Sequence, residues 1–245
     1  QRKHNGDTAR QSLIKLSKAG FTNISADLIF GIPSQGKDSL RKNADILMSL
    51  NVKHISAYAL TVEDKTPLKY LISNNISPPT DNDIQAAHFL YIKDYLRTHG
   101  FLHYEISNYS LPGYESKHNT SYWEGEAYLG LGPSAHSYNN SKRYWNISSV
   151  KKYIEGIKNN KPEGDYEILS KEDHYNEYIM TRIRTSKGIS ADYILKNFGP
   201  KYHRHLNQKL MKHLKGGHLN QNENCISLTS SGMLHADGIT ADLFI

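Results

Sequence analysis

Residues 23–33 read NISADLIFGIP, an apolar run that ends in a glycine and a proline. Side chains of an extended chain alternate between two faces, so Ile24, Leu28 and Phe30 share one face. Asp27 points to the other face, in the middle of the run. Apolar alternation followed by Gly and Pro is typical of a strand and of the turn that ends it. The stretch therefore predicts a buried strand that carries one carboxylate.

The residues around this strand extend the pattern. A helix is predicted from Asp38 to Leu50, and HISAYAL at residues 54–60 predicts a second apolar strand. A strand, a helix and a strand joined by short links are typical of a parallel βαβ unit with a right-handed crossover. On the N-terminal side, Thr8 predicts the cap of a first helix that ends near Gly20. This part of the chain predicts an α/β fold.

The middle of the chain is less regular. Asp81 or Asn82 is the expected cap of a long helix, and a third strand is predicted over residues 101–110. Residues 110–147 are rich in aromatic side chains and show neither helical nor strand periodicity, which favours a functional loop system. A short helix is predicted over residues 149–158.

The pattern changes near residues 161–165, which predict a hinge between two domains, residues 1–163 and 164–245. Beyond the hinge, three amphipathic helices precede two short strands and a terminal helix. The three helices are predicted over residues 170–183, 190–198 and 203–215. Three helices followed by a hairpin are typical of a winged-helix domain.

Composition excludes several classes of protein. The 245 residues include one cysteine, Cys225, which excludes an intrachain disulfide framework and any cysteine-bound zinc or iron–sulfur centre built from this chain alone. No apolar run approaches the roughly 20 residues of a transmembrane helix, and the start QRKHNGDTAR is too polar for a signal peptide. A cytoplasmic protein is therefore expected. The net charge of +6 comes from scattered basic residues, which do not favour nucleic-acid binding.

Four motifs together resemble one family. They are DLIFGIP at residues 27–33, HISAYAL, HNTSYW at residues 118–123 and GLGPSAHSY at residues 130–138. In this order they resemble the HemN/HemW branch of the radical S-adenosylmethionine enzymes, and the resemblance covers essentially the whole chain. It implies the C-terminal part of a (βα)6 partial barrel of the TIM type, followed by the small winged-helix-like α+β domain.

The resemblance also implies cofactors. In that family a [4Fe–4S] cluster, held by a CxxxCxxC loop, cleaves S-adenosylmethionine. This sequence contains no CxxxCxxC motif. We therefore expect a C-terminal portion of a longer protein whose intact form binds the cluster and S-adenosylmethionine. The portion alone is expected to run no radical chemistry, and whether the intact protein is an enzyme stays open.

Four residues are implied as S-adenosylmethionine contacts. They are Arg2, Asp27, Ala59 and His136. Asp27 would accept hydrogen bonds from the ribose hydroxyls, and Ala59 would touch the adenine. Structural interpretations stand beside these roles: a solvated terminus for Arg2, an ion pair for Asp27 and a core histidine for His136.

The segment before His136 predicts a turn. Gly130 and Gly132 permit a close backbone approach or a positive φ, and Pro133 stiffens the chain. No strand-to-helix crossover surrounds these glycines, so they do not form a dinucleotide-binding motif. We expect the turn to present His136.

HNTSYW resembles an element of the haem-chaperone members of this branch. It implies haem contacts through His118, Asn119, Tyr122 and Trp123. Histidine is a natural ligand of haem iron, and aromatic rings stack on porphyrins. His118 is accordingly the candidate metal ligand, and Asn119 would orient its imidazole. The alternative is a loop fixed by hydrogen bonds, with its aromatic side chains in a core.

These inferences leave three functions. The first is a haem chaperone that binds haem or a porphyrin and passes it to an acceptor apo-protein. The second is an oxygen-independent coproporphyrinogen III oxidase of haem synthesis, and HNTSYW favours the first. The third is nucleic-acid binding through residues 203–215, where Leu206, Leu210 and Leu214 instead form an apolar stripe typical of core packing.

Overall fold

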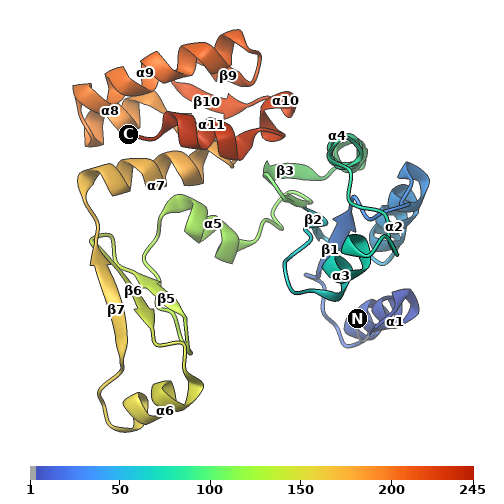
Figure 1. The fold of residues 1–245 in the computed structure, drawn as a ribbon. Helices are drawn as coiled ribbons and strands as arrows, with labels where there is room; N and C mark the ends of the chain where they lie inside the picture. The colour runs from blue at the N-terminus through green and yellow to red at the C-terminus, as the bar shows by residue number, and fades with distance from the viewer. Residues whose placement is uncertain (1–3) are drawn as a thin grey trace. The chain divides into compact units, whose positions relative to one another are not determined.

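The computed structural model describes residues 4–245, and the predicted role of Arg2 lies outside them. The chain divides into two compact units, one ending at Ser116 and one beginning at Lys117 (Figure 1). Both units combine helices with sheets, which confirms the α/β fold class. The predicted domain boundary after residue 163 falls inside the second unit, directly before a strand, and stays a prediction.

The first unit is built on a four-stranded mixed sheet. Its strands are β1 (Ser25–Phe30), β2 (His54–Ala59), β3 (Leu102–Glu105) and β4 (Asn108–Ser110), in the order β1-β2-β4-β3. Its helices are α1 (Gly6–Lys18), α2 (Lys37–Ser49), α3 (Pro67–Ser73) and α4 (Asn82–Thr98). β1 and β2 are parallel and α2 connects them, which confirms the predicted βαβ unit.

Two local predictions for this unit are wrong. Residues 101–110 form the hairpin of β3 and β4 rather than a single strand, and β4 pairs antiparallel with β2. The cap of α1 is Asn5, whose side chain accepts a hydrogen bond from the backbone N–H of Thr8. The Thr8 hydroxyl accepts the Asn5 N–H in return. Thr8 therefore completes a capping box instead of forming the cap.

The sheet of the first unit has one apolar and one polar face. Leu28, Phe30 and Ile55 are buried on the face that α2 and α4 contact, where Ile92 of α4 completes a core. Ile55 and Ile92 have no exposed surface at all. Because side chains alternate along a strand, Asp27 comes to the opposite face.

The second unit contains two antiparallel sheets. Their strands are β5 (His136–Tyr138), β6 (Lys142–Asn146), β7 (Gly164–Ile168), β8 (Ile189–Ser190), β9 (Leu219–Asn222) and β10 (Cys225–Leu228). The two sheets have the strand orders β5-β6-β7 and β8-β10-β9. The helices are α5 (Lys117–Glu124), α6 (Val150–Lys158), α7 (Lys171–Ile183), α8 (Ala191–Asn197), α9 (Pro200–Lys215), α10 (Ser230–Met233) and α11 (Ala236–Leu243). The β5-β6-β7 sheet extends away from α7–α11, and α6 lies at its far end (Figure 1).

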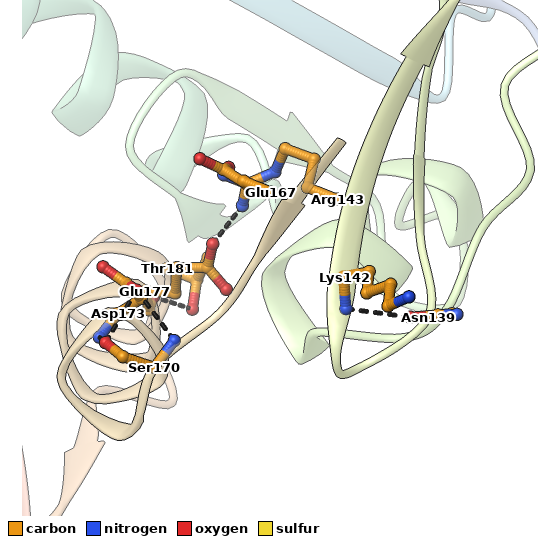
Figure 2. Close-up of polar contacts among 8 residues, drawn as sticks. All are labelled: Asn139, Lys142, Arg143, Glu167, Ser170, Asp173, Glu177 and Thr181. Atoms are coloured by element: carbon orange, nitrogen blue, oxygen red, sulfur yellow. Dashed lines mark hydrogen bonds and ion pairs between the residues drawn. The ribbon is translucent and has the colours of Figure 1, made fainter. Parts of the chain in front are cut away.

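The C-terminal predictions are largely confirmed. The three predicted helices are α7, α8 and α9, and the two predicted strands pair as β9 and β10. Ser170 and Asp173 form a capping box at the start of α7 (Figure 2). Two details are wrong: the terminal helix is divided into α10 and α11, and the segment 110–147 contains α5, β5 and β6. Fully buried Ile179 and Leu206 anchor α7 and α9 in a common core.

Candidate functional site

Asp27 lies on the polar face of the first sheet. It pairs with Ser56 across the parallel β1–β2 ladder, so both side chains point to the same side. Asp27 is exposed and forms no hydrogen bond or ion pair with any residue in the range 4–245. The structural ion pair considered from the sequence thus finds no partner in the described chain. The carboxylate has its full capacity to accept hydrogen bonds from a ligand.

A hydrogen-bonded chain beside Asp27 was missed from the sequence. The buried His54 ring joins the Ser25 hydroxyl, 2.8 Å from Nδ1, to the Tyr104 hydroxyl, 2.7 Å from Nε2. Burial lowers the pKa of His54, although the nearby Asp27 carboxylate opposes the shift. Burial also raises the pKa of Tyr104 to about 12. Strand alternation could have placed Ser25, Asp27 and His54 on one face, but the sequence does not show the register.

Ala59 is the exposed last residue of β2 and pairs with Phe30. Its side chain lies on the opposite face of the sheet from Asp27, because its partner Phe30 is three residues from Asp27 along β1 and side chains alternate along a strand. A ligand that reached both residues would therefore meet Ala59 through its backbone. His136 belongs to the second unit, and the structure describes no geometry that joins it to Asp27 or Ala59.

The predicted turn before His136 is present. A Cβ atom at Gly130 would lie 2.0 Å from the His136 carbonyl oxygen, so only glycine fits this approach of two backbone segments. Gly132 has a φ of +111°, which also favours glycine. The buried Asn146 amide donates to the carbonyls of Gly130, at 3.3 Å, and Gly132, at 2.9 Å. His136 itself is exposed, with its ring centroid 5.9 Å from that of Trp145.

HNTSYW lies on α5, which corrects the expectation of an irregular loop. His118 and Tyr122 are four residues apart and share one face of the helix. Their rings meet edge to face at 4.9 Å, and Tyr122 meets Tyr128 in the same way at 4.8 Å. His118 is exposed, whereas Asn119 and Trp123 are half-buried. The motif therefore places an exposed imidazole beside a row of aromatic rings.

A cavity of about 770 Å³ opens next to this helix, within the second unit. Helices α5, α7 and α8, the β5-β6 hairpin and the segment between α5 and β5 contribute its walls. The aromatic lining residues are Tyr122, Trp123, Tyr128, Tyr138, Tyr178, Tyr193 and Phe198. The indole Nε1 of Trp123 is buried without a hydrogen-bond partner among the described residues. A volume of this size and an aromatic lining are typical of a small-molecule site.

Ion pairs hold the walls of this cavity. The Arg143 guanidinium on β6 donates to Glu167 on β7, at 2.8 Å, and to Glu177 on α7 (Figure 2). Lys187 donates to Glu124 of α5, and this hydrogen bond lowers the pKa of Glu124. Paired charges thus connect the part of the cavity wall that the sheet forms with the part that the helices form. Sequence reasoning missed Arg143 because its partners lie 24 and 34 residues away.

Residues 4–245 contain no group of three or more His, Cys, Asp or Glu side chains arranged to hold a metal ion. Cys225, the single cysteine, donates its thiol to the Lys187 carbonyl at 2.8 Å. One thiol cannot supply the ligands of a [4Fe–4S] cluster, so the donor set of this chain does not fit that group. In the described range, no helix is long and apolar enough to span a bilayer.

Comparison with known proteins matches this chain to one group of sequences. Residues 169–235 match the HemN C-terminal domain family. The haem chaperone HemW of Lactococcus lactis is 33% identical over 191 residues, which cover 78% of this chain and 50% of that protein. HemW of Bacillus subtilis is 33% identical over 228 residues, which cover 91% of this chain and 59% of that protein.

The predicted resemblance to the HemN/HemW family is confirmed. The chain spans about half the length of these HemW relatives. The solved structure of coproporphyrinogen III oxidase (HemN) from Escherichia coli, a radical SAM enzyme, has a TM-score of 0.75. It is 16% identical, and the match covers 99% of this chain and 59% of that one. The similarity to HemN therefore concerns the fold alone. Individual residues are compared with the HemW sequences.

Proposed function

We propose that this chain binds haem as part of a HemW-type haem chaperone that delivers haem to an acceptor apo-protein. The observation that carries the proposal is the aromatic helix α5, with His118 and Tyr122 on one face and Trp123 in a cavity wall. Relatives named for haem chaperoning, at 30–33% identity, support it. HNTSYW also favours this function over coproporphyrinogen oxidation.

In this proposal the residues of the α5 motif make different contacts with haem. Tyr122 and Trp123 offer ring faces to the porphyrin, since aromatic rings stack on conjugated planes. The exposed imidazole of His118 is the candidate iron ligand from the motif, and Asn119 orients it. Bound haem supplies no chemistry here, because it is the cargo that the protein transfers.

The finer features of the fold belong to the same proposal. β1 and β2 would be two strands of a (βα)6 partial barrel, and residues 164–245 would form the winged-helix-like domain. Asp27, Ala59 and His136, together with Arg2, would contact S-adenosylmethionine. The unpaired carboxylate of Asp27 fits the ribose hydroxyls of that cofactor. The polar face of the sheet would then point toward the inside of the barrel.

The test is a titration of the full chain with ferric haem, followed in the Soret region. The wild-type chain should give a saturable shift, and His118→Ala should weaken binding about tenfold, as expected for the loss of an iron ligand or of one strong polar contact. His203→Ala is the matched control, because His203 is a half-buried histidine on α9 outside both α5 and the cavity lining. Absence of saturable binding by the wild-type chain would reject the proposed function.

A further inference from the structure

Helix α6 has an apolar face that the described chain leaves exposed. Its residues Val150, Ile154 and Ile157 are between 45% and 61% exposed. At 3.6 residues per turn these three side chains lie within an arc of about 60°, so they form one narrow apolar face. Single exposed apolar residues are common on protein surfaces, whereas several on one face of a helix form a patch that a partner can cover.

The other side of α6 holds the helix in place. The Tyr153 hydroxyl accepts a hydrogen bond from the Gly132 N–H at 3.0 Å. Gly156 is buried, and a Cβ atom at this position would lie 2.8 Å from the Lys161 carbonyl oxygen. These contacts fix α6 against the chain and leave its apolar face to the solvent. A partner would therefore meet a helix that is already formed.

A fourth apolar side chain lies next to this face. Leu131 is 81% exposed, more than any other large apolar side chain among residues 4–245. It directly precedes Gly132, which is bonded to Tyr153, so its backbone lies beside α6. Leu131, Val150, Ile154 and Ile157 are named the α6 patch here. Figure 1 shows α6 at the far end of the β5-β6-β7 sheet, so the patch lies at a protruding end of the second unit.

Lysines surround the α6 patch. Residues 150–161 contain one acidic residue, Glu155, and four lysines, which are Lys151, Lys152, Lys158 and Lys161. Four positive charges less one negative charge give +3, which is half of the +6 of the whole chain. All four lysines are exposed, and none forms an ion pair with a described carboxylate. Their charges are therefore available to an anionic partner.

Shape and charge favour a lipid surface as this partner. A helix at the end of an arm is convex, so a protein partner would have to supply a groove for it. The head groups of a bilayer instead part around an amphipathic helix, and lysines beside the apolar face attract anionic lipids. Lys151 and Lys158 lie at one margin of the apolar face, about a quarter turn from Val150. This arrangement is typical of helices that lie in a membrane interface.

We infer that the α6 patch adsorbs to the surface of an anionic bilayer, with its apolar side chains among the head groups and Lys151 and Lys158 on lipid phosphates. Such adsorption is peripheral and reversible, and salt weakens it. The inference is independent of the proposed function, because the α6 patch contains no residue of α5 or of the aromatic cavity.

Cosedimentation of the full chain with lipid vesicles tests the inference. Vesicles of mixed phosphatidylcholine and phosphatidylglycerol should bind the wild-type chain saturably at low salt. Vesicles of phosphatidylcholine alone should bind it at least about tenfold more weakly. Ile154→Glu should weaken binding to the mixed vesicles at least about tenfold, because it places a negative charge in the apolar face. Met211→Glu, at an exposed position of α9, is the matched control and should change binding by less than about twofold.

A second pair of variants tests the lysines. The double variant Lys151→Gln, Lys158→Gln should bind the mixed vesicles about tenfold more weakly than the wild-type chain. The double variant Lys196→Gln, Lys215→Gln removes the same net charge from exposed positions of α8 and α9. It should bind within about threefold of the wild-type chain. Circular dichroism checks folding, and sedimentation velocity without lipid gives the oligomeric state of each variant.

Three outcomes would overturn the inference. The first is the absence of saturable binding of the wild-type chain to the mixed vesicles at low salt. The second is equal behaviour of Ile154→Glu and Met211→Glu, or of the two lysine variants, which would assign binding to the overall charge. The third is a wild-type dimer in the absence of lipid that Ile154→Glu converts to a monomer, since a second copy of the chain would then cover the patch.

Discussion

The two larger sheets of the molecule are stabilised in different ways. In the β1-β2-β4-β3 sheet, four consecutive residues of β2 are buried, and α2 and α4 contact β1. In the β5-β6-β7 sheet, Asn146 is the one buried residue among the thirteen strand positions, which all lie in the described range, and every residue of β7 is exposed. The first sheet is held by a core, and the second mainly by backbone pairing, a polar turn and ion pairs.

The first sheet therefore serves as a scaffold, whereas the second sheet presents side chains at a surface. Burial of apolar side chains gives the first sheet its stability and leaves a polar face with Asp27 and His54. The second sheet contributes Tyr138 and Arg143 to the wall of the aromatic cavity. A weakly buried sheet can present such side chains to a ligand, because they are not needed to fill a core.

The largest expected effect is on the core of the first sheet. Ile55→Ala should lower the free energy of unfolding by about 3 kcal/mol, since a fully buried isoleucine leaves a cavity. Ile168→Ala on β7, where the isoleucine is 69% exposed, should change it by less than about 0.5 kcal/mol. Urea unfolding with amide hydrogen exchange of β2 and β7 measures both. Equal losses would remove the contrast between the sheets.

A somewhat smaller effect is expected at the turn of the second sheet. Gly130→Ala should destabilise β5 and β6 by about 2 kcal/mol, because the new methyl group meets the His136 carbonyl oxygen. Gly238→Ala on α11 is the control: its Cβ meets no atom within 4 Å, and alanine favours a helix. Hydrogen exchange of the β5 and β6 amides reports the loss. A harmless Gly130→Ala would mean that this turn does not fix the sheet.

The first sheet should also respond to acid. Burial lowers the pKa of His103 from 6.5 to about 4, and its ring stacks on Tyr109. Between these values the unfolded chain binds a proton that the folded chain does not, so stability falls as the pH falls. Above pH 6.5 this contribution is complete. We expect a loss on the order of 2 kcal/mol between pH 7 and pH 4.

The slope of stability against pH tests this assignment. Unfolding is followed at several pH values in the wild-type chain and in His103→Leu, whose side chain cannot be protonated. The variant starts from lower stability, because the hydrogen bond of Nε2 with the Ile106 carbonyl is lost, but its slope should be shallower. Parallel slopes would assign the acid sensitivity to other groups, of which the buried His54, with its lowered pKa, is the first to examine.

The smallest effect concerns the ion pairs that join the second sheet to α7. Arg143→Met should cost about 1 kcal/mol, because the Arg143 side chain is 30% exposed and water screens much of its attraction to Glu167 and Glu177. Arg97→Met, which breaks a pair exposed on both sides, should cost almost nothing. A double-mutant cycle with Glu177→Gln isolates the pair, and the coupling energy should fall in high salt. Zero coupling at low salt would contradict the link.

The first unit could be predicted best where its signals are local. Alternation in NISADLIFGIP and HISAYAL fixes two strands, and the intervening helix fixes their parallel pairing. The β3–β4 hairpin was missed because its turn, Ile106 and Ser107, contains no glycine, proline or Asn-Gly pair. Two short strands without a turn signal look like one longer strand.

The second unit was harder to predict at its candidate site. HNTSYW contains few strong helix formers, and α5 is stabilised by its contact with α7, which local propensity does not show. The residues that line the cavity are spread along the sequence from Tyr122 to Phe198, so no single stretch indicates it. The spacing of His174, Tyr178 and Thr181 on one helical face was visible in the sequence, but an amphipathic helix has the same spacing.

The position of Trp123 has a consequence for optical work on this protein. The chain contains two tryptophans, Trp123 in the cavity wall and Trp145 on β6. A porphyrin that absorbs where indole emits would accept excitation energy from a tryptophan in van der Waals contact with it. Replacing Trp145 by phenylalanine would leave Trp123 as the single emitter, so its lifetime would report cavity occupancy without any attached label.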